Sequence, residues 1–219
     1  MYIAIEGVIG VGKTTLARLL KDKLDAHLEL EVFEENPFLA DFYGDRARYA
    51  FQTQIFFLLS RYHQQRKAIR EVVEDSGGKL ITDYTFAKDA LFARINLEGD
   101  ELDVYYQTHE ALAEKIAIPD LIVYLKADTD VLMKRIAKRD RTYERDMDPA
   151  YIEALNDSYN EYFEKNEAGA KVLIINSNDL DFVLYEEDLL LIEDRIRQAL
   201  QIKPYQSELI KMQKYLEET

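Results

Sequence analysis

The chain has 219 residues, and its 28 Lys and Arg residues against 42 Asp and Glu residues give a formal charge of −14. The absence of cysteine excludes a disulfide framework, a thiolate zinc site and a cysteine nucleophile. The acidic balance argues against a nucleic-acid polymer as partner, because such a partner needs a basic surface. The N-terminus has no signal-peptide pattern and no apolar run reaches about eighteen residues, so we expect a cytoplasmic protein without a membrane partner.

Short apolar runs alternate with helical patterns along the chain. The predicted strands span 2–5, 29–33, 79–82, 121–125 and 172–175. The predicted helices begin near 14 and then span 48–73, 87–96, 101–117, 131–138, 150–164 and much of the last forty residues, with Pro204 as a break. This alternation predicts an α/β fold with a parallel sheet covered on both faces. With no repeat or linker, we expect one domain over 1–219 that ends in a helical extension at about 203–219.

A phosphate-binding motif follows the first predicted strand. Residues 7–14, GVIGVGKT, fit the P-loop pattern G-x-x-x-x-G-K-[ST] and lead into a predicted helix. Backbone N–H groups and the helix N-terminus would hold the phosphates of ATP, Lys13 would reach the β- and γ-phosphates, and Thr14 would ligate Mg²⁺. The expected ATP-binding residues here are Gly7, Gly10, Val11, Gly12, Lys13, Thr14 and Thr15. No guanine-binding N-K-x-D motif is present and the chain is short for a motor, so a small-molecule kinase is favoured.

Basic residues gather in one short stretch of this acidic chain. They are Arg135, Lys138, Arg139, Arg141 and Arg145. We predict an arginine-rich lid over about 135–147 that closes over the triphosphate, with Arg135 and Arg139 on ATP and with Arg139 and Arg141 stabilising the transferred charge. The alternative is a solvated helix face whose cations pair with the acidic residues among them.

Five segments resemble the deoxyribonucleoside kinase family, and specifically its bacterial purine-nucleoside branch. They are GVIGVGKTT, EVFEENPFLADFY, TQIFFLLSR, TDYTFAKD and RIAKRDRTYER, in the order of the family and within about 3–165. The resemblance implies a P-loop kinase with a three-layer α/β/α fold, a five-stranded parallel sheet and a homodimeric assembly. It also implies transfer of the γ-phosphoryl group of ATP to the 5′-hydroxyl of a purine deoxynucleoside, which gives a monophosphate and ADP in nucleotide salvage.

Carried over to this chain, the resemblance assigns the general base to Glu31, five positions before Asn36. Glu34 and Glu35 are nearby carboxylates that compete for this role. If the segment is a strand, Glu31 and Glu35 share one face.

The resemblance assigns recognition of the nucleobase to Gln54, Arg61 and Asp89, the first two of which share a helix face. The same three residues could instead form a network that only connects two helices. Phe51, Phe86 or Phe92 could sandwich the base, although core packing is the better explanation for any one of them taken singly.

Tyr43 and Glu144 match residues that hydrogen-bond the sugar, and Asp83 matches an acid that helps Thr14 to hold Mg²⁺. Most of the family has arginine directly after this acid, where the present chain has Tyr84. Either Lys88 or a lid arginine would then supply the missing charge, or the charge of the transition state is stabilised in another way. The expected substrate-binding set is Glu31, Tyr43, Gln54, Arg61, Asp83, Tyr84, Asp89 and Glu144.

Two other functions compete with this interpretation. A thymidylate-type monophosphate kinase shares the P-loop and the lid, but it needs cations for the acceptor phosphate, and the charged residues within 31–57 are five acids against only Arg46 and Arg48. A nucleotide-binding module without turnover is the second alternative, supported by Tyr84 and by the unmatched segment 203–219. The choice between guanine and adenine stays open, because Gln, Arg and Asp can serve either purine.

Overall fold

A computed structural model describes residues 1–165 and 167–203 of the chain. The predicted extension at 203–219 lies outside the described residues, apart from Lys203. The described part contains one sheet of five parallel strands in the order β2-β3-β1-β4-β5. The strands are β1 Tyr2–Glu6, β2 His27–Glu29, β3 Leu80–Thr82, β4 Leu121–Lys126 and β5 Val172–Asn176. The predicted α/β class and the parallel five-stranded sheet are confirmed.

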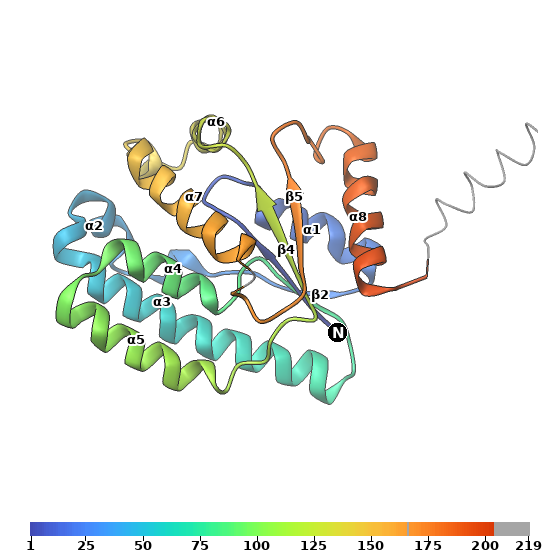
Figure 1. Cartoon of the computed structure of the whole chain (residues 1–219), viewed down its shortest axis with the longest axis horizontal. Coiled ribbons are helices and arrows are strands. Elements are labelled where there is room, and N and C mark those ends of the chain that lie inside the picture. The colour runs from blue at the N-terminus through green and yellow to red at the C-terminus, as the bar shows by residue number, and fades with distance from the viewer. Residues whose placement is uncertain (166, 204–219) are drawn as a thin grey trace, which may run out of the picture.

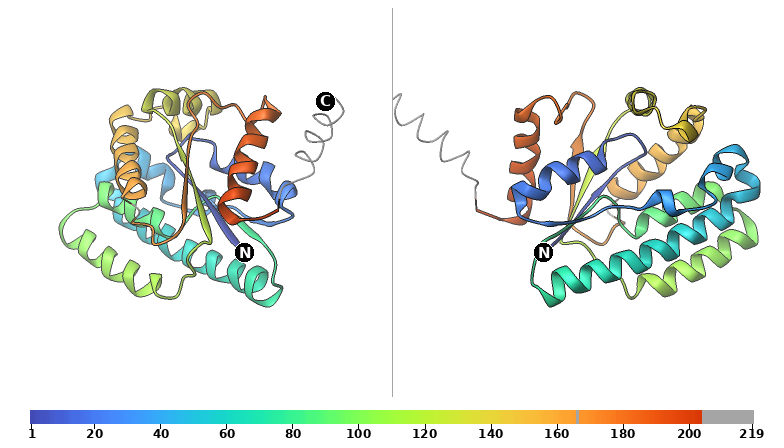
Figure 2. Two further views of the ribbon diagram at one scale, coloured as in Figure 1. Left: turned by 45° about the vertical axis from the view of Figure 1, so that its right-hand side comes forward. Right: turned by 180° about the vertical axis from the view of Figure 1, so that it is seen from behind.

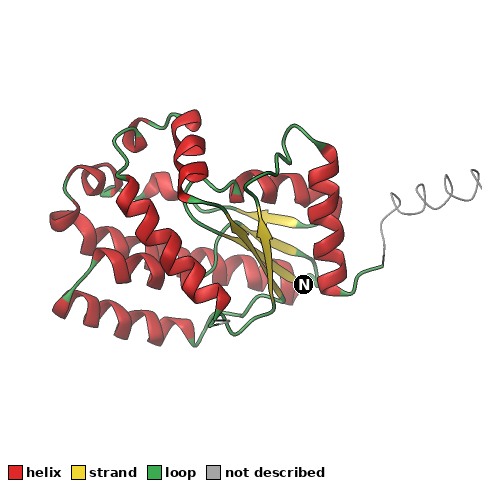
Figure 3. Cartoon of the chain, turned by 45° about the horizontal axis from the view of Figure 1, so that its top comes forward, coloured by secondary structure: helices red, strands yellow, loops and turns green. Residues whose placement is uncertain are grey.

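Helices cover both faces of this sheet, as Figures 1 and 2 show. One face carries α1 Lys13–Leu24 and α8 Glu186–Leu200. The other carries α3 Arg46–Ala68, α4 Ala87–Asn96 and α7 Pro149–Glu164, and α5 Gly99–Ala113 packs outside α3 and α4. The short helix α2 Leu39–Gly44 precedes α3, and α6 Thr129–Arg139 follows β4. The three layers are visible in Figure 3, with yellow strands between red helices.

The central strand explains why the sheet has to be covered on both faces. All five residues of β1 are buried, and Ile3 pairs with Ile81 on one side and with Leu121 on the other. Because successive side chains point to opposite faces, a strand buried throughout needs helices above and below it. Each such isoleucine contributes about 1.5–3 kcal/mol on burial.

The second strand begins and ends earlier than the sequence pattern predicts. We predicted 29–33, whereas β2 spans His27–Glu29, and residues Phe33–Glu35 form the 3₁₀ helix η1. The partner strand β3 ends at Thr82, and the next residue, Asp83, accepts the backbone N–H of Glu31 with its Oδ1 at 2.8 Å. Strand pairing therefore stops before Glu31, and the expectation that Glu31 and Glu35 share a strand face is wrong.

Helix boundaries differ from the predicted ones in smaller ways. The predicted helix 48–73 is α3 followed by the π-helical segment η2, Ile69–Asp75, and the Asp45 side chain caps α3 by accepting the Arg48 N–H. The 3₁₀ helix η3, Thr142–Glu144, interrupts the predicted lid. Among the described helices, none combines the length and the apolar character that a membrane span requires.

Parallel topology places the carboxyl ends of all five strands at one edge of the sheet. Open α/β sheets bind ligands at this edge. The P-loop leaves β1 there, Asp83 follows β3, and Glu31 lies two residues beyond β2. Three segments far apart in the sequence therefore meet at one place.

Candidate active site

The P-loop has a backbone that glycine alone tolerates at two critical points. Gly7 has φ 148°, and a Cβ atom there would lie 2.5 Å from the Leu125 carbonyl oxygen. Gly12, which precedes α1, has φ 105°. Lys13 Nζ arches back over the loop and donates to the carbonyl oxygens of Gly7 at 2.6 Å and Val8 at 3.1 Å. The cation thus lies over the concave side of the loop, where phosphate would bind.

Burial and the nearby charge of Lys88 lower the pKa of Lys13 to about 8, against the opposing charges of Glu6, Glu31 and Asp83. Phosphate oxygens would add negative charge beside this ammonium group and favour its charged form.

Thr14 and Asp83 meet beside the P-loop. The Thr14 hydroxyl donates to Asp83 Oδ2 at 2.5 Å, because the neighbouring strands β1 and β3 carry the two segments. A hydroxyl and a carboxylate are oxygen ligands of the kind Mg²⁺ prefers, so the pair fits the predicted metal site. Residues 1–165 and 167–203 contain no cluster of three or more His, Cys, Asp or Glu suited to a metal. Nucleotide and water oxygens would therefore complete the coordination, as is usual for Mg²⁺ in kinases.

A cavity beside the P-loop receives most of the predicted substrate residues. It has about 850 Å³ of empty space, part of it open to solvent. We call it the acceptor cavity. The predicted residues that line it are Lys13, Thr14, Glu31, Tyr43, Gln54, Arg61, Asp83, Asp89, Arg139, Arg141 and Glu144. Lys88 and Phe92 also line it.

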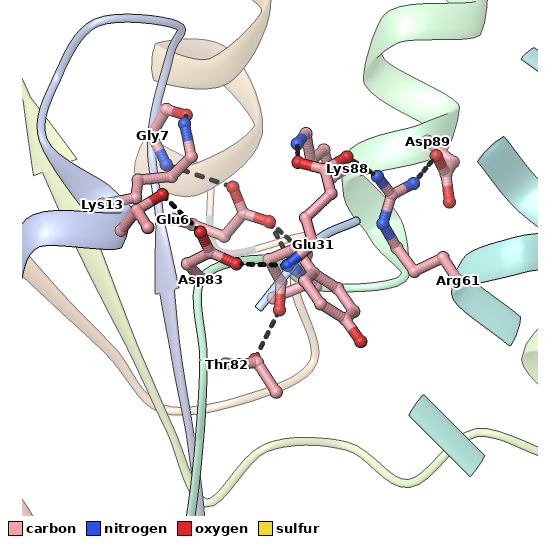
Figure 4. Close-up of polar contacts among 12 residues, drawn as sticks. Glu6, Gly7, Lys13, Glu31, Arg61, Thr82, Asp83, Lys88 and Asp89 are labelled. Carbon is pink, nitrogen blue, oxygen red and sulfur yellow. Dashed lines mark hydrogen bonds and ion pairs between the residues drawn. The ribbon is translucent and has the colours of Figure 1, made fainter. Parts of the chain in front are cut away.

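Glu31 is held in this cavity by two cations. Arg61 pairs with its Oε1 and Lys88 with its Oε2, and both contacts are drawn in Figure 4. Burial alone raises the pKa of the Glu31 carboxyl, but the charges of Lys88 and Arg61 outweigh it and lower the pKa to about 2. Glu34 and Glu35, the competing carboxylates, are exposed on η1 and do not line the acceptor cavity. Geometry therefore favours Glu31 as the base.

Arg61 also pairs with Asp89, so that one guanidinium connects the predicted base-reading acid with Glu31. The planar fork of arginine allows this double contact. Arg61 Nε, Asp89 Oδ2 and Thr53 Oγ1 are buried and have no hydrogen-bond partner among the described residues. Buried polar groups need partners. The Arg61–Asp89 network exists within the protein, as the alternative interpretation expected, and both residues also line the acceptor cavity.

Tyr84 does not line the acceptor cavity. Its side chain is fully buried, and the Arg61 guanidinium lies 5.3 Å from the centre of its ring. Tyr84 thus supports Arg61 by a cation–π contact rather than meeting a ligand directly. Lys88, at the start of α4, supplies the cation beside Glu31.

Of the three aromatic candidates, Phe92 alone lines the acceptor cavity. Phe86 stacks on His109 with ring centroids 4.7 Å apart, and Phe51 packs against the core. Phe57 lines the cavity although we did not predict it. A signal was available, because Phe57 lies between Gln54 and Arg61 on the same face of α3.

The predicted lid is organised by one buried carboxylate. Glu144 accepts hydrogen bonds from Arg139, at 2.5 and 3.1 Å, and lies 3.5 Å from Arg141. Tyr43 stacks on Tyr143 beside it, with centroids 5.7 Å apart. Arg145 pairs with exposed Asp140. The alternative interpretation expected such local pairs, with Glu144 as well as with Asp140, but Arg139 and Arg141 also line the acceptor cavity, whereas Arg145 does not.

A second hollow, the donor cavity, adjoins the outer side of the P-loop. Val11, Gly12 and Thr15 line it together with the segment 180–184, which precedes α8. Arg135 lines it too, but its guanidinium donates to the carbonyl oxygens of Ser177 at 2.6 Å and Leu180 at 3.3 Å. Arg135 is therefore a fixed wall of the donor cavity. We did not predict the segment 180–184, which carries no recognisable motif.

Gly10 and Arg139 line both cavities, so the two meet at the P-loop. A phosphate-binding loop between two adjoining cavities, with a carboxylate opposite its lysine, is the arrangement that phosphoryl transfer between two substrates requires. The fold and the site define a P-loop kinase.

Comparison with known proteins places the chain within this class. The sequence profile of the deoxynucleoside kinase family matches residues 3–201. The chain is 32% identical over 202 residues to a deoxyguanosine kinase of Bacillus subtilis, covering 91% of this chain and 97% of that protein. It is 34% identical over 180 residues to a deoxyadenosine kinase of Dictyostelium discoideum, covering 80% of this chain and 71% of that protein.

A structure of deoxyadenosine kinase from M. mycoides with the products dCMP and dCDP bound superposes with a TM-score of 0.79. It is 27% identical and covers 90% of this chain and 100% of that one. The chain belongs to the deoxynucleoside kinase family. Membership makes it an ATP-dependent kinase of deoxynucleosides.

Proposed function

We propose that this enzyme transfers the γ-phosphoryl group of ATP to the 5′-hydroxyl of a purine deoxynucleoside. The observation that carries the proposal is the pairing of Glu31 with Arg61 and Lys88 inside a cavity that also exposes Lys13 and Thr14 of the P-loop. A hydroxyl bound beside Glu31 would face the phosphate site directly.

The acceptor cavity suits a neutral acceptor. Near the carboxylates of Glu31, Asp83 and Asp89, the cations Arg61 and Lys88 are already paired with acids. An acceptor phosphate would need a cation of its own at this position. The support for a purine base comes from the relatives named for deoxyguanosine and deoxyadenosine, and from the polar side chains of Gln54, Arg61 and Asp89 in the wall of the acceptor cavity.

In the proposed reaction, the 5′-oxygen attacks the γ-phosphorus while Glu31 accepts the hydroxyl proton. The bond from the γ-phosphorus to the bridging oxygen breaks, and ADP leaves with the electron pair. A carboxylate with a pKa of about 2 is a weak base. A loose phosphoryl-transfer transition state needs little prior deprotonation, so Glu31 serves mainly to orient the hydroxyl and to receive its proton late.

Positive charge around the transferred group comes from Lys13 and from Arg139, which lines both cavities. Arg141 lies within the same cavity wall, 4.2 Å from the centre of the Phe33 ring. Thr14 and Asp83 would hold Mg²⁺, which when bound neutralises charge on the β- and γ-phosphates.

The resemblance further leads us to propose one catalytic domain that acts as a cytoplasmic homodimer in nucleotide salvage. Light scattering tests the assembly directly: a dimer mass is expected, and a monomer mass at micromolar concentration would contradict it.

The function is tested by coupled ADP release with ATP and Mg²⁺ against six acceptors, namely dGuo, dAdo, dCyd, dThd, dGMP and dTMP. We expect turnover with a purine deoxynucleoside and none with either monophosphate. Turnover of dGMP or dTMP alone would overturn the proposal. The ratio of kcat/KM for dGuo and dAdo then decides between guanine and adenine.

A further inference from the structure

A buried carboxylate outside the two cavities has no role in the reaction just described. Glu6 ends the central strand β1, its side chain is fully buried, and it does not line either cavity. Burying a carboxylate is costly unless hydrogen bonds satisfy it. Its position, directly before the P-loop, suggests that its contacts serve the site.

The three hydrogen-bond donors of Glu6 are uncharged groups on two different segments. Oε2 accepts the Gly7 N–H at 3.1 Å, and Oε1 accepts the N–H and the hydroxyl of Thr85, at 2.5 and 2.9 Å. Figure 4 shows the carboxylate between the P-loop and the segment that follows β3. One side chain therefore connects the first glycine of the P-loop to Thr85.

Thr85 lies between the two residues that this segment contributes to the site. Asp83, two positions earlier, contacts Thr14 and the backbone of Glu31, while Lys88, three positions later, pairs with the Glu31 carboxylate. The Thr85 carbonyl also accepts the N–H of Lys88 at 3.3 Å, which starts α4. A shift of Thr85 would move Asp83 and Lys88 together.

The charge of Glu6 also interacts with two cations of the site. Burial raises the pKa of its carboxyl, and the nearby charges of Lys88 and Lys13 oppose that effect. The carboxylate thus lies near two of the cations that serve the phosphates and Glu31, without occupying either cavity.

We infer that Glu6 is a positioning residue that fixes the segment 83–88 against the P-loop and so holds Asp83 and Lys88 in reach of Thr14 and Glu31. The kinetic effect expected from this role rests on the proposed function, whereas the anchoring of 83–88 does not. Both oxygens of Glu6 must accept, because all its partners donate. In Glu6→Gln the amide NH₂ would face one of these donors, with no change in side-chain size.

The first test is kinetic. Glu6→Gln should lower kcat by about 10²-fold, as expected for a small misplacement of catalytic groups, and should leave KM for ATP and nucleoside within about threefold. Thr85→Val removes one hydrogen bond to Glu6 and should lower kcat by about tenfold, and Thr85→Ser should restore it. Wild-type kcat in Glu6→Gln, or equal loss in Thr85→Val and Thr85→Ser, would overturn the inference.

The matched control is Glu193→Gln. Glu193 is equally buried but lies on α8, where it pairs with Arg197 at 2.8 Å and with Lys23 at 3.7 Å. This variant should lose stability to heat while keeping kcat within about twofold. If Glu193→Gln lowers kcat as much as Glu6→Gln does, burial alone explains the effect and the positioning role is wrong.

Hydrogen exchange provides a readout that needs no turnover. Amides in 83–88 should exchange faster in Glu6→Gln than in the wild type, whereas Glu193→Gln should leave them unchanged. Unchanged exchange in 83–88 of Glu6→Gln would overturn the anchoring. If the wild type phosphorylates none of the six acceptors, the proposed function fails, and exchange still decides whether Glu6 anchors this segment.

Discussion

The acceptor and donor cavities meet at the P-loop but are built on opposite principles. The acceptor cavity contains four charged side chains in direct contact, which are Glu31, Arg61, Lys88 and Asp89, and the Asp83 carboxylate beside them accepts the backbone N–H of Glu31. The donor cavity is lined by the P-loop, by the segment 180–184, in which Val183 and Leu184 are 65% and 70% exposed, and on one side by Arg135, Lys138 and Arg139.

This difference predicts that the acceptor cavity discriminates between ligands more strongly than the donor cavity does. Buried polar groups that lack a partner penalise a wrong ligand strongly, whereas apolar walls discriminate weakly. The acceptor cavity has such groups in Arg61, Asp89 and Thr53. In the donor cavity, Asp181 is already engaged, because its Oδ1 accepts the N–H groups of Val183 and Leu184. We therefore expect strict choice of the acceptor and tolerant choice of the donor.

The largest effect is expected from Glu31→Gln, which removes the proton acceptor and keeps the shape. The rate should fall by about 10²–10⁴-fold, while ATP binding, measured by calorimetry, stays intact. Glu35→Gln, four positions along and exposed, is the control and should retain normal turnover. If the two variants behave alike, Glu31 is not the base.

A smaller loss, confined to one substrate, is expected from Asp89→Asn. It weakens the contact to Arg61 and the edge offered to the nucleobase, so kcat/KM for the nucleoside should fall by about 10–10²-fold. KM for ATP should not change, because Asp89 lies in the acceptor cavity only. Steady-state kinetics with each substrate varied measures both, with exposed Asp103→Asn as control. Equal losses of kcat/KM for the nucleoside and for ATP would contradict the assignment of the two substrates to separate cavities.

Lys88→Met should change the pH dependence. Lys88 lowers the pKa of Glu31 against the effect of burial, so its removal moves that pKa up from about 2 and shifts the acid limb of kcat/KM to higher pH. The folded wild-type protein holds the pKa of Glu31 below its value in the unfolded chain, so ionised Glu31 stabilises the fold. This contribution to folding stability is complete above the unfolded pKa and is lost as the pH falls towards 2. In the variant this loss begins at higher pH. Lys165→Met, an exposed control, should leave the profile unchanged.

The smallest effect concerns the donor. Replacing ATP by GTP should change kcat/KM by less than about tenfold, because a single unmatched polar group in an open site is worth about 1 kcal/mol. Parallel rates with both donors measure this. A preference of 10³-fold or more would show that the donor cavity also reads base edges.

Much of the fold was predictable because parallel strands leave a simple pattern. Continuous apolar runs such as 121–125 are buried on both faces, and β4 lies where we expected it. The run at 29–33 misled us, because its later residues serve the site instead of the sheet. Whether Glu31 lies in a strand depends on Asp83, 52 positions away, which accepts its N–H. Local sequence does not contain that contact.

The site was predictable where residue types form a motif and unpredictable where their role depends on a neighbour. The P-loop and the Gln54–Arg61 spacing could be read directly. Tyr84 could not, because its contact with the Arg61 guanidinium depends on α3 lying against the segment that follows β3. Arg135 belongs to a basic cluster but contacts the carbonyl oxygens of Ser177 and Leu180. The donor segment 180–184 leaves no motif, since its backbone and apolar side chains form the wall.

The most direct test of the central claim is to identify where the phosphoryl group goes. A reaction of ATP, Mg²⁺ and the preferred purine deoxynucleoside can be followed by ³¹P NMR. We predict one new resonance, from a 5′-monophosphate, that grows in equal amount with ADP. Inorganic phosphate in place of the monophosphate, or a 3′-monophosphate, would contradict the assignment of Glu31 and the acceptor cavity to the 5′-hydroxyl.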